Sequence, residues 1–301
     1  MVDFDSRELQ CFLLVLKERN FSRVASILGV TQPTISLQIS RLETKLGGRL
    51  FERLPQGLHP TALAHELEGV ALKIIEAIES FDEDLKADQS LLKGTVRYAM
   101  PESCQWTPHY RAIMAKIKEF PDLNFKIEIL PNHLISEKLL SAEIDFGFIV
   151  GEKNHPELRF EKFSDETYTL AANDIGILKN FTKSKDLSSL RIIAYPGWEL
   201  FFSCWCEAQG LSKKLKSLQS TPTVKIGSLA GAIHALQEGA GVCVVPTHCI
   251  SNELKSSKLF EIKKQSPAQH PVYLARRHGV KQPARVTRVM ELLKEAKATL
   301  G

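Results

Sequence analysis

Apolar residues recur at helical spacing in three short stretches near the N-terminus of the chain. The first stretch covers residues 3–18, and the second covers residues 21–28. Gly29 follows directly, and glycine readily takes the positive φ of a tight turn. A third apolar stripe lies between Thr31 and Gly47. This pattern predicts two helices that meet across a turn of roughly three to four residues, which is typical of a helix-turn-helix.

The third predicted helix has two distinct faces. The Thr31 hydroxyl can cap its first turn, and Pro33 suits that turn because its missing N–H is not needed there. One face is a buried stripe, whereas the opposite face and its flanks are short, uncharged and able to hydrogen bond to base edges in the major groove. Basic residues that follow can contact phosphates. The buried stripe is Ile35, Ile39, Leu42 and Leu46, and the predicted DNA contacts are Gln32, Pro33, Thr34, Ser36, Leu37, Arg41 and Arg53, with Lys45 and Arg49 as further phosphate partners. An ordinary helical hairpin is the alternative, because Ala-x-x-x-Gly alone is common.

A hairpin and a long helix follow. Residues 50–60 contain a Pro-Gln-Gly turn between short extended runs, which predicts the wing of a winged helix. Residues 61–88 repeat apolar positions at intervals of three and four, which predicts a heptad seam. We expect a second copy of the chain to cover this seam, and the alternative is a helix that lies on its own domain. The predicted dimer contacts are Leu63, Leu67, Val70, Ile74, Phe81 and Leu85.

From Gly94 onward the pattern alternates between strands and helices. Three strands separated by two helices form a βαβαβ unit, which predicts a parallel sheet. A second set follows, so we expect two α/β lobes joined by crossing strands, with a cleft at the carboxyl ends of the strands. The predicted strands are 95–100, 123–130, 144–150, 165–172, 191–195, 223–226, 242–245 and 272–276, and the predicted helices are 108–120, 133–142, 198–209, 228–238 and 284–299.

The predicted fold is therefore an α/β multidomain chain with an N-terminal winged helix-turn-helix, a long linker helix and a C-terminal two-lobed α/β domain. The predicted domains are residues 1–60, 61–90 and 91–301. The first lobe is expected at about 91–163 and 267–301, and the second at about 164–266.

The composition permits large cores but provides little positive charge. The chain has 301 residues, and its formal net charge is only +4. Residues 21–53 carry five Lys or Arg against two Glu, a local balance of +3. Because so few charges give modest, salt-sensitive DNA binding, we expect two copies to bind side by side. The N-terminus is acidic and no long apolar run is present, so we expect no signal peptide, no membrane contact and a cytoplasmic protein.

Two other functional classes compete with DNA binding. The six cysteines include one local pair, Cys204 and Cys206, which leaves a redox-responsive regulator as an alternative. Their side chains would point apart on a helix, and no Cys-x-x-Cys spacing suits zinc, so we expect no metal site. A two-lobed α/β domain could also be an enzyme. The sequence lacks a dinucleotide fingerprint, a phosphate loop, a nucleophile elbow and a zincin histidine pair, so catalysis is a remote alternative.

Residues 9–61 resemble the N-terminal domain of LysR-type transcriptional regulators. The resemblance implies a homodimer or a dimer of dimers that binds double-stranded operator DNA, with Ser22 among the contacts. The chain departs from the family pattern at Val24, where Ala is usual, at Gln56, where the wing often has Arg, and at Leu37 and Ser40, which are often basic. The matching residues are Leu9, Phe12, Val15, Phe21, Ser22, Ala25, Leu28, Gln32, Pro33, Ser36, Gln38, Ile39, Leu42, Glu43, Leu46, Gly47, Leu50, Phe51, Arg53 and Thr61.

The C-terminal half resembles the effector-binding domain of the same family, which has the periplasmic binding protein architecture. Its anchors are Gly94, residues 144–147 and residues 238–246. The resemblance implies a small-molecule effector between the lobes and no cofactor. The implied ligand contacts are Glu102, Ser103, Val150, Gly151, Tyr195, Trp198, Ser228, Pro246 and Thr247. Ser228 could instead be a plain helix cap and Glu102 an exposed loop charge. The nearby rings of Trp106, Trp198, Phe201, Phe202 and Trp205 favour an aromatic or flat apolar ligand, although such rings are more often core.

Overall fold

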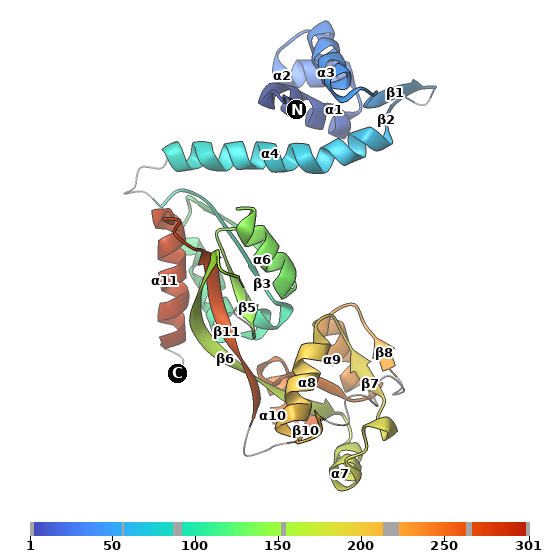
Figure 1. Cartoon of the computed structure of the whole chain (residues 1–301), viewed down its shortest axis with the longest axis vertical. Helices are drawn as coiled ribbons and strands as arrows, with labels where there is room; N and C mark the ends of the chain where they lie inside the picture. Colours follow the sequence, from blue (N-terminus) through green and yellow to red (C-terminus); the bar gives the residue numbers. More distant parts are fainter. Residues whose placement is uncertain are drawn as a thin grey trace. The chain divides into compact units, whose positions relative to one another are not determined.

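The structure, a computed structural model, describes residues 3–55, 57–86, 92–151, 155–212, 223–262 and 267–298 (Figure 1). The chain divides into two compact units, Met1–Asp88 and Gln89–Gly301. Each unit has a hydrophobic core of its own. None of the described helices has the length and the apolar run that a bilayer crossing needs.

The first unit is a winged helix-turn-helix followed by a long helix. Its elements are α1 (Ser6–Glu18), α2 (Phe21–Leu28), α3 (Gln32–Leu46), β1 (Phe51–Leu54), β2 (Gly57–Pro60) and α4 (Ala62–Lys86). Side chains of Asp5 and Asn20 cap α1 and α2 by accepting first-turn N–H groups. Gly29 has φ +66° and ends α2, as the sequence predicted. Strands β1 and β2 pair antiparallel to form the wing.

One local expectation for this unit is wrong. Val24 and Ala25 are buried on α2, whereas Leu28 and Val30 are exposed. The Thr31 hydroxyl does not cap α3, because it lies 2.9 Å from the Thr34 hydroxyl and pairs with it instead. The turn of the helix-turn-helix is therefore held by Gly29 and by core packing.

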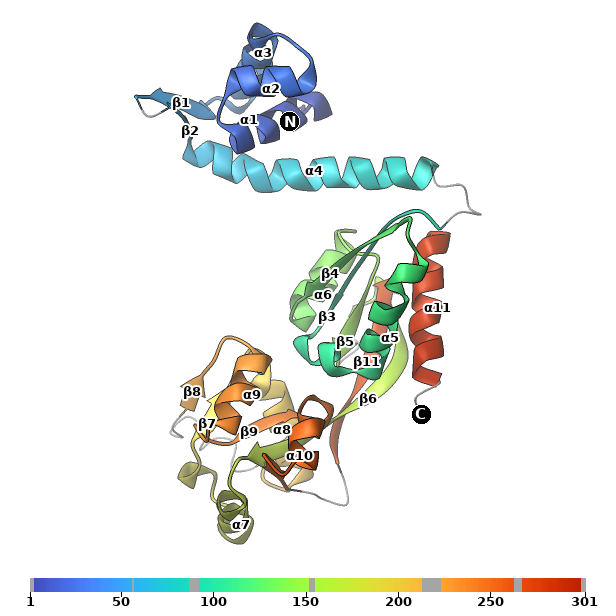
Figure 2. The ribbon, with the colours of Figure 1, turned by 180° about the vertical axis from the view of Figure 1, so that it is seen from behind.

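The second unit is built on a seven-stranded sheet with strand order β10-β6-β11-β5-β3-β4, and β9 pairs with β6 beside this path. Strands β3 (Gly94–Met100), β4 (Leu123–Ile129) and β5 (Phe146–Val150) are parallel, as the sequence predicted for a βαβαβ unit. Helices α5 (Pro108–Lys116), α6 (Asn132–Leu140) and α11 (Ala284–Ala298) pack against this part of the sheet (Figure 2). These elements form the first lobe.

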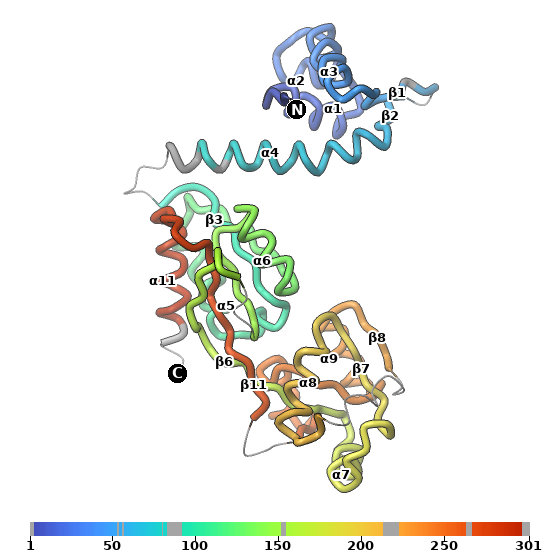
Figure 3. Tube along the Cα trace, in the orientation of Figure 1, coloured from blue at the N-terminus to red at the C-terminus, as the bar shows by residue number. Residues whose placement is uncertain are grey.

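Two long antiparallel strands connect the first lobe with the second. Strand β6 (Leu158–Ala172) pairs with β11 (Ala268–Arg277), and the register shifts between Val272 and Tyr273. Figure 3 traces both strands from one lobe into the other. The second lobe contains α7 (Ile175–Ser184), β7 (Ile192–Ala194), α8 (Trp198–Ala208), β8 (Thr223–Lys225), α9 (Leu229–Gln237), β9 (Cys243–Pro246), α10 (Ser251–Lys255) and β10 (Phe260–Glu261). The sequence missed the first half of β6 and all of α7.

Candidate DNA-binding and ligand-binding sites

The candidate DNA-reading surface is the face of α3 that points away from its core. Ile35, Ile39 and Leu42 are buried, whereas Leu37 is 52% exposed. The other predicted contacts on this helix keep at least part of their surface open: Gln32, Thr34 and Ser36 are half-buried, and Pro33 and Arg41 are exposed, as is Ser22 on α2. The exposed face of α3 is therefore uncharged and able to hydrogen bond to base edges, with Leu37 as an apolar side chain on it. Arg41 follows on the same helix and can contact a phosphate.

Not every predicted phosphate partner is available. The Lys45 ammonium lies 2.6 Å from Glu8, whose side chain is almost buried, so this pair joins α3 to α1. This ion pair holds the Lys45 ammonium against α1, so it is less available to a DNA phosphate. The backbone of Arg53 lies in β1, but the Arg53 side chain and all of Gln56 lie outside the described residues.

The long helix α4 divides its apolar residues between two surfaces. Ala64, Leu67, Ala71 and Ile75 are buried in the core of their own unit. Leu67 was predicted to face a second chain, but it packs in the core of its own unit and is only 5% exposed. Val70 and Phe81 are 48% and 62% exposed. Leu63 and Ile74 pack partly against the core, and the Leu85 side chain lies outside the described residues.

A cavity of about 380 Å³ lies between the two lobes of the second unit. Residues that follow β3, β4 and β7 line this cavity. Ligands in open α/β sheets bind at this same place, beyond the carboxyl ends of the strands. Four predicted ligand contacts lie together in this lining, namely Glu102, Ser103, Val150 and Tyr195. Phe201, one of the rings predicted near the cleft, also lies in the lining. Other lining residues were not predicted from the sequence, and they include Leu130, Pro131, Asn132, Leu200, Gly227 and Leu229.

The remaining predicted contacts are not part of this lining. The Ser228 hydroxyl caps α9 by accepting the Gly231 N–H at 3.1 Å. Trp198 packs edge-on against Phe202, with ring centroids 5.3 Å apart. The Thr247 hydroxyl donates to the Thr167 carbonyl oxygen at 3.2 Å. Gly151 and Pro246 are also absent from the lining; Pro246 pairs with Tyr168 in the sheet. Four of the nine predicted positions therefore lie in the lining of this cavity, and five do not.

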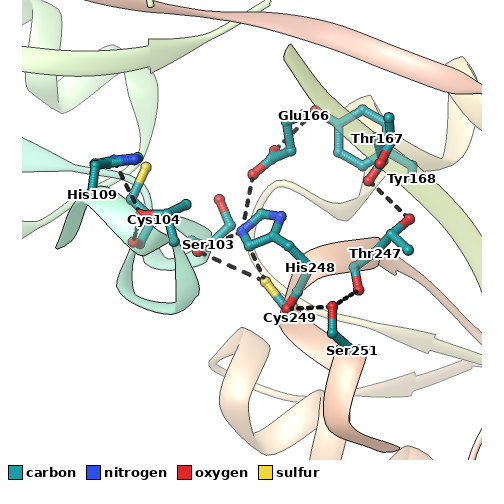
Figure 4. Close-up of polar contacts among 11 residues, drawn as sticks. Ser103, Cys104, His109, Glu166, Thr167, Tyr168, Thr247, His248, Cys249 and Ser251 are labelled. Atoms are coloured by element: carbon teal, nitrogen blue, oxygen red, sulfur yellow. Dashed lines mark hydrogen bonds and ion pairs between the residues drawn. The ribbon is translucent and has the colours of Figure 1, made fainter. Parts of the chain in front are cut away.

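Buried polar groups form a cluster around Glu166, which lies on the connecting strand β6 (Figure 4). The Tyr168 hydroxyl donates to Glu166 Oε2 at 3.0 Å, and His248 Nε2 lies 3.9 Å from Oε1. Burial raises the pKa of the Glu166 carboxyl, and the neighbouring His248 opposes this shift. Ser103 belongs to the same cluster, and its buried hydroxyl forms no hydrogen bond. Ser103 lines the first cavity, and Glu166 lines a second cavity of about 340 Å³.

The redox alternative finds no support at the thiols. Cys204 and Cys206 both lie on α8, and Cys206 is fully buried. Burial raises the pKa of both thiols, that of Cys206 to about 12. Since the thiolate is the reactive form, neither cysteine is activated. Among the described residues no group of three His, Cys, Asp or Glu side chains is placed to hold a metal ion.

Family models match both halves of the chain. The model of the bacterial regulatory helix-turn-helix protein, lysR family, matches residues 6–65, and that of the LysR substrate binding domain matches residues 89–298. The RuBisCO operon transcriptional regulator of Acidithiobacillus ferrooxidans is 23% identical over 300 residues, which cover 97% of this chain and 94% of that protein. The HTH-type transcriptional regulator YofA of Bacillus subtilis (strain 168) is 20% identical over 249 residues, or 82% of each.

Solved structures share the same fold. The crystal structure of full-length CbnR complexed with its target DNA matches with a TM-score of 0.68 and 19% identity, covering 97% of this chain and 100% of that chain. A crystal structure of full-length BenM matches with a TM-score of 0.55 and 21% identity, covering 99% of this chain and 96% of that chain. At these identities the likeness shows the fold, namely a helix-turn-helix, a linker helix and an α/β effector domain.

Proposed function

This chain belongs to the LysR family of DNA-binding transcriptional regulators, and from that premise we propose that a small molecule in the cleft between its two lobes controls operator binding. The observation that carries the proposal is the cavity itself. Its volume of about 380 Å³ falls within the usual range for small-molecule sites, and both lobes contribute to its lining. A ligand there would contact both lobes and so could favour one arrangement of them.

The N-terminal unit is proposed to read the operator through α3 and to dimerise through α4. The exposed face of α3 supports the first part, because it offers Ser36 and Gln32 to base edges and Arg41 to a phosphate. The exposed apolar residues Val70 and Phe81 support the second part, since two such faces can cover one another. The chain would act in the cytoplasm as a homodimer or a dimer of dimers.

A thermal-shift screen of metabolites followed by two titrations tests the proposal. Each compound that raises the melting temperature is titrated into the full-length protein with and without operator DNA. Coupling between the sites requires two different affinities, typically by a factor of about 5 to 150, and the same factor must appear when DNA is titrated with and without the compound. Equal affinities in both titrations would show that the cleft is not the switch.

A further inference from the structure

The polar end of the cleft is already occupied by a carboxylate of the chain. Glu102 follows β3 in the first lobe, and its two oxygens accept hydrogen bonds from the backbone N–H groups of Leu229 at 2.8 Å and Ala230 at 3.0 Å. These N–H groups open α9 in the second lobe, where the helix dipole favours negative charge. The next donor, the N–H of Gly231, is taken by Ser228. Glu102 therefore stands where a bound anion would stand.

Apart from the exposed imidazole of His133, the other polar side chains around the cleft offer no substitute for these donors. The Asn132 amide donates to the Val150 carbonyl oxygen at 2.7 Å and accepts from the Val150 N–H at 3.2 Å. The Tyr195 hydroxyl donates to the Val244 carbonyl oxygen at 3.0 Å. Within the described lining there is no lysine or arginine. The Ser103 hydroxyl, on a residue that is 3% exposed, makes no hydrogen bond.

Apart from His133, the remaining lining residues are apolar. Ile129 and Leu130 come from the end of β4, Val150 comes from the end of β5, and Leu200 and Phe201 come from α8. Apolar walls stabilise a ligand in proportion to the apolar area they remove from water, and a ring system presents such area with few torsions to restrain. The lining therefore fits a flat apolar body better than a chain of polar groups.

From this arrangement we infer that the cleft binds a flat and largely apolar molecule that carries no carboxylate, and that Glu102 excludes carboxylates. The inference rests on the proposed function and names its ligand class. A ligand carboxylate would find both N–H groups of α9 occupied and would be repelled by the like charge of Glu102. An uncharged molecule meets neither obstacle.

Displacement of Glu102 by a ligand carboxylate is unfavourable for a further reason. The carboxylate of Glu102 is tethered to the same protein as the two donors, so it competes at a high effective concentration. Its hydrogen bonds also join the first lobe to the second, and an incoming anion would break that link. The substitution Glu102→Ala removes the competitor and leaves the two donors free.

Matched probes test the inference in the full-length protein. Two pairs are titrated by calorimetry: benzoate with benzamide, then indole-3-acetate with indole-3-acetamide. The wild-type protein should bind the amide of a pair at least about tenfold more tightly than the acid, whereas Glu102→Ala should shift the preference toward the acid by a similar factor. Glu119→Ala removes an exposed acid from the same lobe and should keep the wild-type order. Glu102→Gln provides a second variant of nearly the same shape.

The outcomes separate this inference from the proposed function. A wild-type preference for the acid would overturn the inference, and so would an acid-to-amide ratio that Glu102→Ala and Glu102→Gln leave unchanged. Absence of binding by every probe to every variant would also overturn it, because an apolar cleft of this size would then not accept a flat ring. Binding of an amide that leaves operator affinity unchanged would support the ligand class while counting against the proposed function.

Discussion

Ser36 and Arg41 lie on the same helix, but their chemistry gives them different tasks. Ser36 can hydrogen bond to a base edge, whereas the exposed Arg41 guanidinium suits a phosphate that every sequence carries. We expect Ser36→Ala to relax operator preference at one base pair, by about 1–3 kcal/mol. We expect Arg41→Ala to weaken all DNA sequences alike and to make the salt slope shallower by about one.

Fluorescence anisotropy with operator and scrambled DNA, each at several salt concentrations, measures both effects. Arg41→Ala is the matched control for Ser36→Ala because both substitutions shorten exposed or half-exposed side chains of α3. Equal losses on operator and scrambled DNA for Ser36→Ala would remove Ser36 from base reading. Gln32→Ala extends the comparison by one helical turn.

His109 makes the second unit sensitive to acid. It is buried among Phe148 and Phe163, and its Nε2 lies 3.1 Å from the Thr107 hydroxyl. Burial, helped by His248, lowers the His109 pKa to about 4. The unfolded chain has the ordinary pKa near 6.5, so it binds more protons between these two values. Because of His109, the free energy of unfolding therefore decreases by up to about 3 kcal/mol as pH falls from about 6.5 to about 4.

The measurement is the urea midpoint of the full chain at several pH values in that window. His109→Gln should flatten the loss of stability relative to the wild type. Glu166 acts in the opposite direction, because its raised pKa makes the folded state bind the extra proton, so the difference between variant and wild type is the informative quantity. His278→Gln, which removes a histidine at an exposed position, is the control variant. Parallel curves for His109→Gln and the wild type would contradict the prediction.

Residue roles were predictable where they depend on near neighbours. Gly29 and the buried stripe of α3 follow from spacing alone, and both are confirmed. Glu102 was predicted to lie at the cleft, but its partner Leu229 is 127 residues away, and no local pattern records such a distance. Ser228 was open to two interpretations from sequence, and the structure selects the cap. The contacts of side chains that bind to the other lobe, such as those of Glu102, therefore could not be predicted from the sequence.

Helix α4 carries an apolar stripe that its own unit does not cover. Val70 and Phe81 lie on this stripe, next to the side that packs against α1. Charges at both positions should prevent a second copy from packing there, so Val70→Glu with Phe81→Glu should reduce the mass of the assembly and weaken operator binding. Leu72 is equally exposed but lies about 200° around the helix from Val70, so Leu72→Glu is the control.

Light scattering of the three proteins decides this prediction. The double variant should have about half the mass of the wild type if the helix pairs two chains. Retention of the wild-type mass and of operator affinity by the double variant would show that the stripe is covered in some other way. Loss of mass in Leu72→Glu alone would place the contact on the opposite side of α4.

Element boundaries were predictable where the apolar pattern is strong. The parallel strands β3, β4 and β5 are buried or alternate clearly, and all three were predicted. The first half of β6 was missed because Arg159, Glu161 and Lys162 make it read as a polar loop, although ten positions of β11 hold this strand in the sheet. Helix α7 had a usable local signal, since the Asp174 side chain caps it by accepting the Gly176 N–H at 2.7 Å.

At the scale of the whole molecule, the proposed function requires that ligand binding in the cleft changes the DNA affinity of the N-terminal unit. The two compact units share one chain, and a ligand can affect DNA binding only if it binds one arrangement of the lobes more tightly than another. Filling the cleft with a side chain should therefore remove the response to ligand without removing DNA binding. The choice of position determines whether the experiment is clean.

Gly227 is a better position for this test than Ser103. Ser103 is almost fully buried, so a large side chain there would disturb the core. Gly227 lines the cavity, a Cβ atom added to it meets nothing within 4 Å, and its φ lies outside the left-handed region. Gly227→Leu should abolish the ligand-induced thermal shift and the change in operator affinity, while operator affinity without ligand stays within about twofold of the wild type. Gly227→Ala adds a single methyl group and should weaken the ligand only partly. A wild-type response in Gly227→Leu would count against this cavity as the regulatory site, because a leucine side chain there takes space that a bound molecule needs.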